Sequence, residues 1–346
     1  MKPDLTDFVI LSGFLGSGKT TLLSEFLAQG ADDGTAVIVN DIGEVNIDGA
    51  ILAVHDGVPM ATLGNGCVCC SLINDLQFTV ESLIASRRAT TGKAFSRIVL
   101  ECSGLSDPGA VMRGLSALSS HGMRVRVVTT YAANNQVSRD DFPLLAAQVC
   151  GAHTVVVTKL DLCEEAQRAH ALAEINVLAP LSHRVVEQDR GRRATAAFLD
   201  STSAAPVCMD PAMTRVGLPG SHARVKAFTL SWDTPLEWQA FSDWMENVAG
   251  YLEGRLLRVK GILRIANCAD GVLVQGVGQH FDPPARIVAH APRSQIVIIT
   301  VDTDAKTLLS IPSNLPPPAV SSLSSTTSPG EVGFRFTRPL LLFPTR

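Results

Sequence analysis

An eight-residue segment near the start of the chain limits the fold more than any other feature. It reads G-F-L-G-S-G-K-T from Gly13 to Thr20 and directly follows the apolar stretch Phe8–Leu11. After it, Leu and Phe recur at helical spacing as far as Gly30. Glycines at these positions let backbone amides wrap a phosphate, and the start of a helix adds partial positive charge. The pattern G-x-x-x-x-G-K-[ST] between a strand and a helix therefore predicts a phosphate-binding loop.

The residue types of this loop predict distinct tasks. We expect Lys19 to neutralise the β- and γ-phosphates of a nucleotide and the Thr20 hydroxyl to hold Mg²⁺. The phosphate-binding residues predicted here are Gly13, Gly16, Ser17, Gly18, Lys19, Thr20 and Thr21.

Short apolar runs alternate with helical patterns over roughly the first 190 residues. The runs are rich in Val and Ile with little polar alternation, which is typical of strands buried on both faces of a parallel sheet. The predicted strands are Phe8–Leu11, Ala36–Asn40, Arg97–Glu101, Arg124–Thr130, His153–Thr158 and Arg184–Glu187. This repetition predicts an α/β fold, a doubly wound parallel sheet of the P-loop NTPase class, over residues 1–190.

Composition changes after residue 190 and predicts a second, smaller domain. Residues 191–223 are polar or rich in Ser, Ala, Pro and Gly, so we interpret them as a linker or crossover. Strand patterns around one long helical pattern, Pro235–Tyr251, then predict an α+β domain over residues 224–312. The Ser-, Thr- and Pro-rich composition from Ser313 predicts a disordered tail over 313–346.

Two further segments follow predicted strands. Glu101 ends the strand Arg97–Glu101 and Gly104 follows it, where P-loop enzymes place a carboxylate for the Mg²⁺ site or the attacking water and a backbone N–H for the γ-phosphate. Thr158, Lys159 and Asp161 form T-K-x-D, which resembles a guanine-binding motif. The carboxylate of Asp161 can accept two hydrogen bonds from guanine, whereas adenine would leave it unpaired.

Three cysteines stand within four positions, at Cys67, Cys69 and Cys70. The following Ser71 is placed to cap a helix, and thiols near a helix N-terminus have a lowered pKa and bind metal readily. Three thiolates favour Zn²⁺, with Co²⁺ compatible by geometry, and leave one tetrahedral position open. Inert buried cysteines and a thiol redox switch remain alternatives. The other five cysteines are isolated, so we expect them in the core.

Composition narrows the classes of partner. The chain is 46% hydrophobic and 18% charged, which excludes a disordered protein, and its formal net charge is −4. That charge gives no electrostatic case for nucleic acid or an anionic membrane. The first residues, M-K-P-D-L-T-D, lack the pattern of a signal peptide, so the cytoplasm is the expected compartment.

Together these segments resemble the CobW-type family of metallochaperone GTPases. The resemblance rests on the phosphate loop, on N-D-I-G-E-V-N-I-D at 40–48, on G-N-G-C-V-C-C-S-L at 64–72, on E-C-S-G-L-S-D-P at 101–108 and on T-K-L-D. In the second domain, L-L-R-V-K-G-I-L-R-I-A-N at 256–267 is similar to the family's C-terminal domain. The chain departs from the family pattern at Asp41, at Asn46, at Thr158 and at the end of the strand Arg124–Thr130, where no Asp stands.

The resemblance implies Mg-GTP binding, slow GTP hydrolysis, and metal binding by Cys67, Cys69 and Cys70 that is coupled to the nucleotide. Asp41, Glu44 or Glu101 would position water or sense the γ-phosphate, and the metal would pass to a client metalloprotein. A homodimer stays open.

Two rival functions share part of the pattern. A P-loop kinase of small molecules would account for the phosphate loop but not for C-V-C-C or T-K-L-D. A metal-sensing regulatory GTPase would use the same metal site, although the acidic balance argues against DNA as its target.

Overall fold

The computed structural model describes residues 6–30, 34–40, 58–63, 71–115, 122–135, 137–179, 182–199, 224–287 and 293–322. The chain forms two compact units, which are treated separately below. The first contains the phosphate loop and a parallel sheet. The second contains an antiparallel sheet, and α5 together with the last part of α6 belongs to it.

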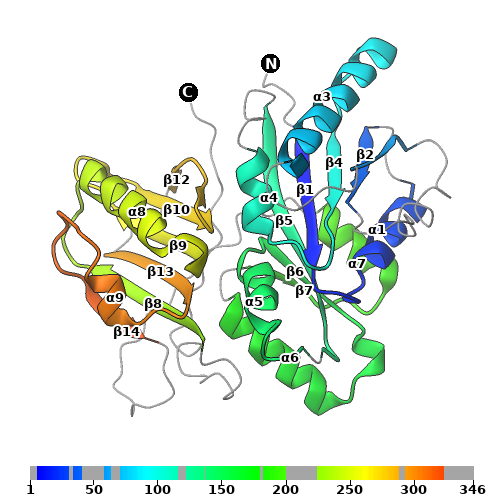
Figure 1. The fold of residues 1–346 in the computed structure, drawn as a ribbon. Helices are drawn as coiled ribbons and strands as arrows, with labels where there is room; N and C mark the ends of the chain where they lie inside the picture. The colour runs from blue at the N-terminus through cyan, green and yellow to red at the C-terminus, as the bar shows by residue number, and fades with distance from the viewer. Residues whose placement is uncertain are drawn as a thin grey trace. The chain divides into compact units, whose positions relative to one another are not determined.

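The parallel sheet follows the order β3-β2-β4-β1-β5-β6-β7 within the described ranges (Figure 1). Its neighbouring strands all run parallel. The strands are β1 (Thr6–Gly13), β2 (Thr35–Val39), β3 (Met60–Thr62), β4 (Arg97–Glu101), β5 (Met123–Ala132), β6 (Thr154–Thr158) and β7 (His183–Val185). This topology confirms the predicted α/β class. The sequence missed β3, whose three residues are too few to show a period.

Helices cover both faces of this sheet. They are α1 (Lys19–Ala28), α3 (Ser71–Thr91), α4 (Pro108–Leu115), α7 (Arg190–Phe198) and the part of α6 (Glu165–Leu178) before Ala173, whereas α5 (Phe142–Cys150) belongs to the second unit. Figure 1 shows α1 and α7 on one side of the sheet and α4 on the other. On the α1 side, Phe26 and Phe198 pack over strand residues such as Val128. Burial of this apolar layer fixes α1, and with it the phosphate loop, to the central strands.

Helix α7 corrects the predicted linker, which was placed from residue 191. Asp189 caps this helix by accepting a hydrogen bond from Arg192 N at 2.8 Å. Arg193 forms an ion pair with Glu25 of α1 at 3.0 Å. The basic residues that suggested a linker therefore include an arginine that holds α7 against α1. Residues 200–223 lie outside the described ranges.

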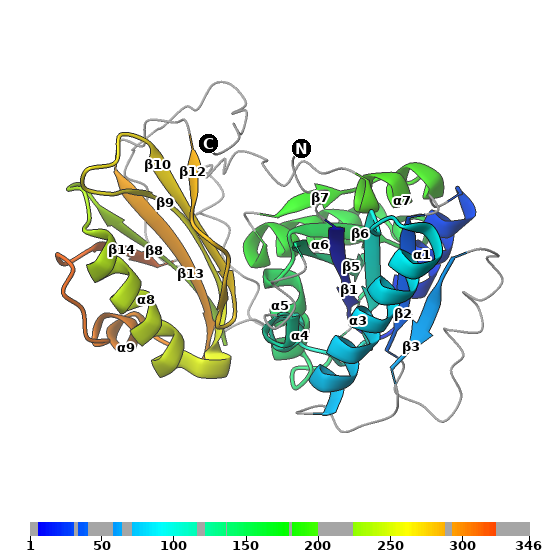
Figure 2. The same ribbon diagram turned by 90° about the horizontal axis from the view of Figure 1, so that it is seen from above.

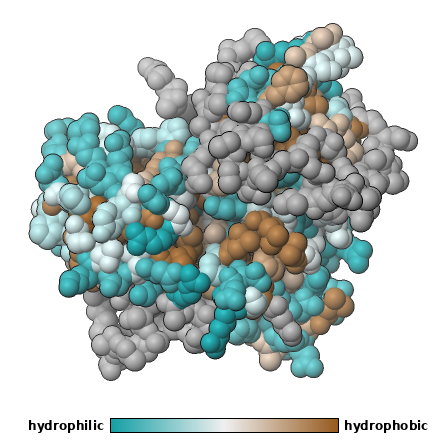
Figure 3. Space-filling view, in the orientation of Figure 1, coloured by the Kyte–Doolittle hydropathy of each residue, from teal (hydrophilic) through white to brown (hydrophobic). Residues whose placement is uncertain are grey.

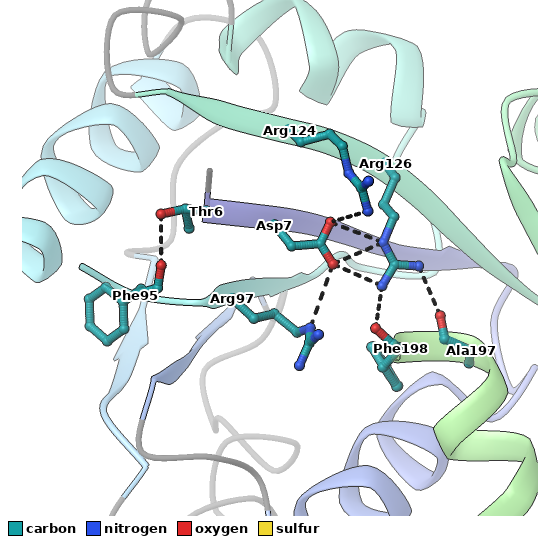
Figure 4. Close-up of polar contacts among 8 residues, drawn as sticks. All are labelled: Thr6, Asp7, Phe95, Arg97, Arg124, Arg126, Ala197 and Phe198. Carbon is teal, nitrogen blue, oxygen red and sulfur yellow. Dashed lines mark hydrogen bonds and ion pairs between the residues drawn. The ribbon is translucent and has the colours of Figure 1, made fainter. Parts of the chain in front are cut away.

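Three arginines converge on Asp7 near the amino ends of the central strands (Figure 4). Arg126 lies 3.0 Å from the carboxylate, while Arg97 and Arg124 lie 3.6 and 3.5 Å away. Arg126 also donates to the carbonyl oxygens of Ala197 and Phe198, the last residues of α7. This cluster ties the end of α7 to the sheet, at the edge opposite the phosphate loop.

The second unit is an antiparallel sheet with a long helix on one face (Figure 2). Its described strands are β8 (Val225–Trp232), β9 (Leu256–Arg264), β10 (Gly271–Val277), β11 (His280–Phe281), β12 (Ala285–Ile287), β13 (Ser294–Val301) and β14 (Ala319–Ser322). The order is β11-β10-β9-β13-β8-β14, with β12 paired to β10. Helix α8 (Trp238–Leu252) buries Phe241, Trp244 and Val248 against the sheet, and the short helices η4 (Glu253–Arg255) and α9 (Ala305–Leu309) complete the unit.

Strand β14 corrects the predicted start of the tail at residue 313. It pairs with β8, with Val320 opposite Leu230. The Trp232 indole N–H donates to the Pro316 carbonyl at 2.7 Å. Residues 313–322 therefore complete the sheet, whereas 323–346 lie outside the described ranges.

On the face shown in Figure 3, the coloured residues are mostly hydrophilic, and apolar side chains form separate patches among them. Among the helices that the structure describes, none combines the length and the apolar composition needed to span a bilayer.

Candidate functional site

The phosphate loop joins the end of β1 to the start of α1. Gly18 stands directly before α1 with a φ of 93°, a left-handed conformation that glycine adopts without a steric penalty. Its carbonyl accepts the first helical hydrogen bond, from Leu22 N at 3.0 Å. The predicted strand, loop and helix are therefore all present. The loop leads into α1, whose first N–H groups have no acceptor within the helix and can bind an anion.

Lys19 lies over the loop that it follows. Its Nζ donates to the carbonyl oxygens of Gly13 at 3.0 Å and Phe14 at 3.3 Å. The ammonium group is thus held at the mouth of the loop by backbone dipoles. A phosphate bound in the loop would meet a positive charge that is already in place, which lowers the cost of ordering this side chain on binding.

Thr20 and Glu101 are brought together although 81 positions separate them. The Thr20 hydroxyl donates to Glu101 Oε1 at 2.6 Å, and Glu101 is only 2% exposed. They meet because β4 lies beside β1, so the carboxyl ends of both strands reach the same edge of the sheet. A hydroxyl and a buried carboxylate are hard oxygen ligands of the kind that Mg²⁺ prefers, so these residues fit the predicted magnesium ion.

The loop after β4 packs closely on the phosphate loop. A Cβ added to Gly104 would lie 2.9 Å from the backbone N and Cα of Leu15, so only glycine fits there without movement. This contact brings the Gly104 backbone beside the phosphate loop, where the sequence placed it. In the same segment, burial raises the pKa of the Cys102 thiol to about 12, although nearby Lys19 opposes the shift. Cys102 is therefore protonated at neutral pH and is a poor metal ligand.

The T-K-L-D segment divides between two places. The Thr158 hydroxyl donates to the Ser17 carbonyl of the phosphate loop at 2.7 Å. It is thus committed to the loop, which differs from the expectation that Thr158 reads the base. Lys159 has a left-handed φ of 57°, and Asp161 lies exposed in the short helix η2 (Leu160–Leu162). Arg168 Nε donates to the Leu160 carbonyl at 2.9 Å, and this hydrogen bond stabilises the backbone turn.

Five predicted site residues fall outside the described ranges. These are Asp41, Glu44, Cys67, Cys69 and Cys70. Their described neighbours lie at the same edge as the phosphate loop: Asn40 N donates to the Glu101 carbonyl at 2.9 Å. Leu63 N likewise donates to the Val39 carbonyl at 3.1 Å, which fixes the chain just before the cysteine segment.

The remaining cysteines behave as the sequence predicted where the structure describes them. Cys102, Cys150 and Cys163 are buried, and Cys268 is partly buried. Burial also raises the pKa of Cys150 to about 12, although Arg258 opposes the shift. Within the described ranges, His, Cys, Asp and Glu side chains form no group of three or more able to hold a metal ion.

Sequence reasoning did not identify Thr130 as part of the site, although its side chain contacts the phosphate loop. Its hydroxyl lies 2.7 Å from the Ser17 hydroxyl, and both residues are buried. Two signals in the sequence concern Thr130, its place near the carboxyl end of a predicted strand and the departure from the family pattern at that strand end, and neither assigns it a contact with the loop.

Comparison with known proteins extends over both units. The profile of the CobW/HypB/UreG nucleotide-binding domain matches residues 7–183, and that of the cobalamin synthesis protein cobW C-terminal domain matches residues 225–311. The zinc chaperone YjiA of Escherichia coli K12 is 30% identical over 276 residues, which cover 78% of this chain and 85% of YjiA. The zinc chaperone CobW of Pseudomonas aeruginosa is 28% identical over 307 residues, covering 79% of this chain and 80% of that protein.

Among solved structures, the crystal structure of Zn(II)-bound YjiA GTPase from E. coli superimposes with a TM-score of 0.61. At 22% identity, it covers 88% of this chain and 96% of the other, so it shows a shared fold through both units.

Proposed function

The chain belongs to the CobW/HypB/UreG family and carries the CobW C-terminal domain, and we propose that it is a GTP-hydrolysing metallochaperone. The observation that carries the proposal is the phosphate loop with Lys19 over its carbonyls and Thr20 on the buried Glu101. This arrangement supports the binding of a nucleoside triphosphate together with Mg²⁺.

Each residue of the site has a proposed part in GTP hydrolysis. The loop amides and Lys19 bind the phosphates and balance their negative charge. Thr20 and Glu101 would hold Mg²⁺, which would neutralise charge on the β- and γ-phosphates. Asp41, Glu44 and Glu101 are the candidates for orienting water. Family membership supports hydrolysis itself, and the slow rate remains part of the proposal.

Guanine recognition is assigned to Lys159 and Asp161. The exposed Asp161 carboxylate can accept hydrogen bonds from guanine N1–H and the 2-amino group, and the Lys159 stem can lie along the base. The Thr158 hydroxyl, which the phosphate loop holds, is left out of the base contacts.

The cargo that we propose is zinc, with cobalt as the alternative. Relatives that match both units are named zinc chaperones. Cys67, Cys69 and Cys70 are the proposed ligands, because three neighbouring thiolates suit a soft or borderline cation. Cys102 and Cys150 are buried, and burial raises the pKa of both thiols, which disfavours metal binding there. Delivery requires a client metalloprotein, and reduced thiols suit the cytoplasm.

The test measures phosphate release from GTP and cobalt absorption in four proteins. Wild type should release phosphate and show a thiolate-to-cobalt charge-transfer band in the near ultraviolet. Lys19→Ala should lose hydrolysis and keep the band, whereas the triple change of Cys67, Cys69 and Cys70 to Ser should lose the band. Cys102→Ser is the matched control and should keep the band.

Two results would contradict the proposal. Hydrolysis at the wild-type rate in a folded Lys19→Ala protein would reject the nucleotide site. A γ-phosphate that appears on a small molecule, without free phosphate, would favour the kinase alternative.

A further inference from the structure

The Ser17 hydroxyl of the phosphate loop points into the protein. Ser17 is 3% exposed, and its Oγ lies 2.7 Å from Thr130 Oγ1 on β5. Thr130 Oγ1 in turn lies 3.3 Å from the Ser12 carbonyl, to which it can donate. With its proton on Ser12, Thr130 accepts the Ser17 proton, so both hydroxyl groups are used.

The same contact explains the first glycine of the motif. Gly13 has a φ of 141°, and a Cβ there would lie 2.6 Å from both Ser17 Oγ and the Thr130 carbonyl oxygen. The loop therefore passes over Thr130 with no room for a side chain between them. Because β5 pairs with β1 as far as Gly13 and Thr130, the strand that carries Thr130 is fixed relative to the loop.

Ser17 is held from two strands at once. Thr130 on β5 binds its hydroxyl, and Thr158 on β6 donates to its carbonyl at 2.7 Å. Both contacts are buried, where a hydrogen bond is stronger than in water. The Thr158 contact fixes the peptide group between Ser17 and Gly18, and the Thr130 contact fixes the Ser17 side chain, so both hold the turn that has to surround a phosphate.

We propose that Thr130 is a positioning residue for nucleotide binding, which acts through the Ser17 hydroxyl to hold the phosphate loop in its binding conformation. Thr130 itself does not touch the nucleotide. This inference rests on the proposed nucleotide site, and it assigns a function to a residue on a strand that carries none of the recognised motifs.

The experiment measures GDP affinity by calorimetry in Thr130→Val, which keeps the side-chain shape and removes the hydroxyl. One buried hydrogen bond is worth about a tenfold change in affinity, so we expect GDP to bind roughly ten times more weakly. Ser17→Ala should weaken binding by a similar factor. The double variant should be no weaker than either single one, because all three lack the same bond.

Controls separate positioning from a general loss of structure. Thr130→Ser restores a hydroxyl and should recover most of the affinity. Thr154→Val removes a buried hydroxyl from the amino end of β6 and should bind GDP like wild type. Thermal unfolding identifies variants that have lost the fold. Ser17→Ala removes the same hydrogen bond by a change on the loop, so the inference can be tested even if Thr130→Val does not fold.

The outcomes distinguish a failure of this inference from a failure of the proposed function. Wild-type GDP affinity in folded Thr130→Val, or additive losses in the double variant, would overturn the inference while leaving the proposed function in place. Failure of wild type to bind GDP or GTP would overturn both. A shared, non-additive loss with recovery in Thr130→Ser supports the inference.

Discussion

Thr158 and Asp161 are three positions apart in one motif, yet their side chains lie in different surroundings. The hydroxyl of Thr158 is directed to the phosphate loop, while Asp161 is exposed after the left-handed turn at Lys159. Sequence reasoning could predict that the motif follows a core strand. It could not separate the two roles, because side-chain direction depends on a backbone turn that only the folded chain shows.

Base specificity should therefore depend on Asp161. In Asp161→Asn, the amide cannot accept both guanine hydrogen bonds but can donate to the 2-oxo group of xanthine. We expect GDP affinity to fall by about tenfold to a hundredfold and XDP affinity to rise, since an unpaired polar group costs about 1–3 kcal/mol. Competition binding with GDP and XDP measures both, and an unchanged preference for GDP would reject this residue as the base reader.

Lys260 predicts a pH dependence of stability in the second unit. Burial, with a smaller contribution from neighbouring Arg258, lowers its pKa to about 8, although Asp282 opposes the shift. The ordinary lysine pKa is about 10.4, so between pH 8 and 10 the unfolded chain binds a proton that the folded chain has lost. The free energy of unfolding should therefore rise through this window, by roughly 3 kcal/mol in total.

Tryptophan fluorescence isolates this effect, because the three tryptophans are Trp232, Trp238 and Trp244, all in the second unit. Urea unfolding at several pH values should show the rise in wild type and in the control Lys226→Met, whose lysine is less buried. Lys260→Met should lack it. An equal rise in all three proteins would assign the effect to other groups.

At the scale of elements, the sequence predicted best where a residue is buried among apolar neighbours. The strands Arg97–Glu101 and Thr154–Thr158 are close to prediction because their run of apolar residues reflects burial on both faces of the sheet. Helix α7 was missed because its basic residues, which suggested a linker, form ion pairs with Glu25. Strand β14 was missed because a Ser- and Pro-rich stretch has little apolar signal of its own. In both, a partner distant in sequence decides the structure.

Strand β14 should contribute measurably to the stability of the second unit. A chain ended after Pro312 loses the pairing with β8, the bond from Trp232 to Pro316 and the packing of Leu315 and Val320. We expect it to unfold at lower urea than a chain ended after Ser322, with a loss of about 2–4 kcal/mol. Equal stability by tryptophan fluorescence would return residues 313–322 to the predicted tail.

For the whole molecule, the two matched family domains support one proposed activity, a metallochaperone controlled by its nucleotide. The phosphate loop and the described residues beside the cysteine segment lie at the same edge of the parallel sheet. The γ-phosphate is proposed to order the segment around residues 40–48 and to bring Cys67, Cys69 and Cys70 into ligand geometry. If so, GTP and metal must each raise the affinity for the other by the same factor.

The most direct measurement of this claim is a zinc titration against a competing chromophoric chelator in three states: free, GDP-bound and bound to a non-hydrolysable GTP analogue. We predict that zinc binds more tightly with the GTP analogue than with GDP, by about 5–150-fold. The analogue's affinity should rise by the same factor when zinc is bound, and Cys102→Ser should behave like wild type. Equal zinc affinity in all three states would contradict the nucleotide control of metal binding.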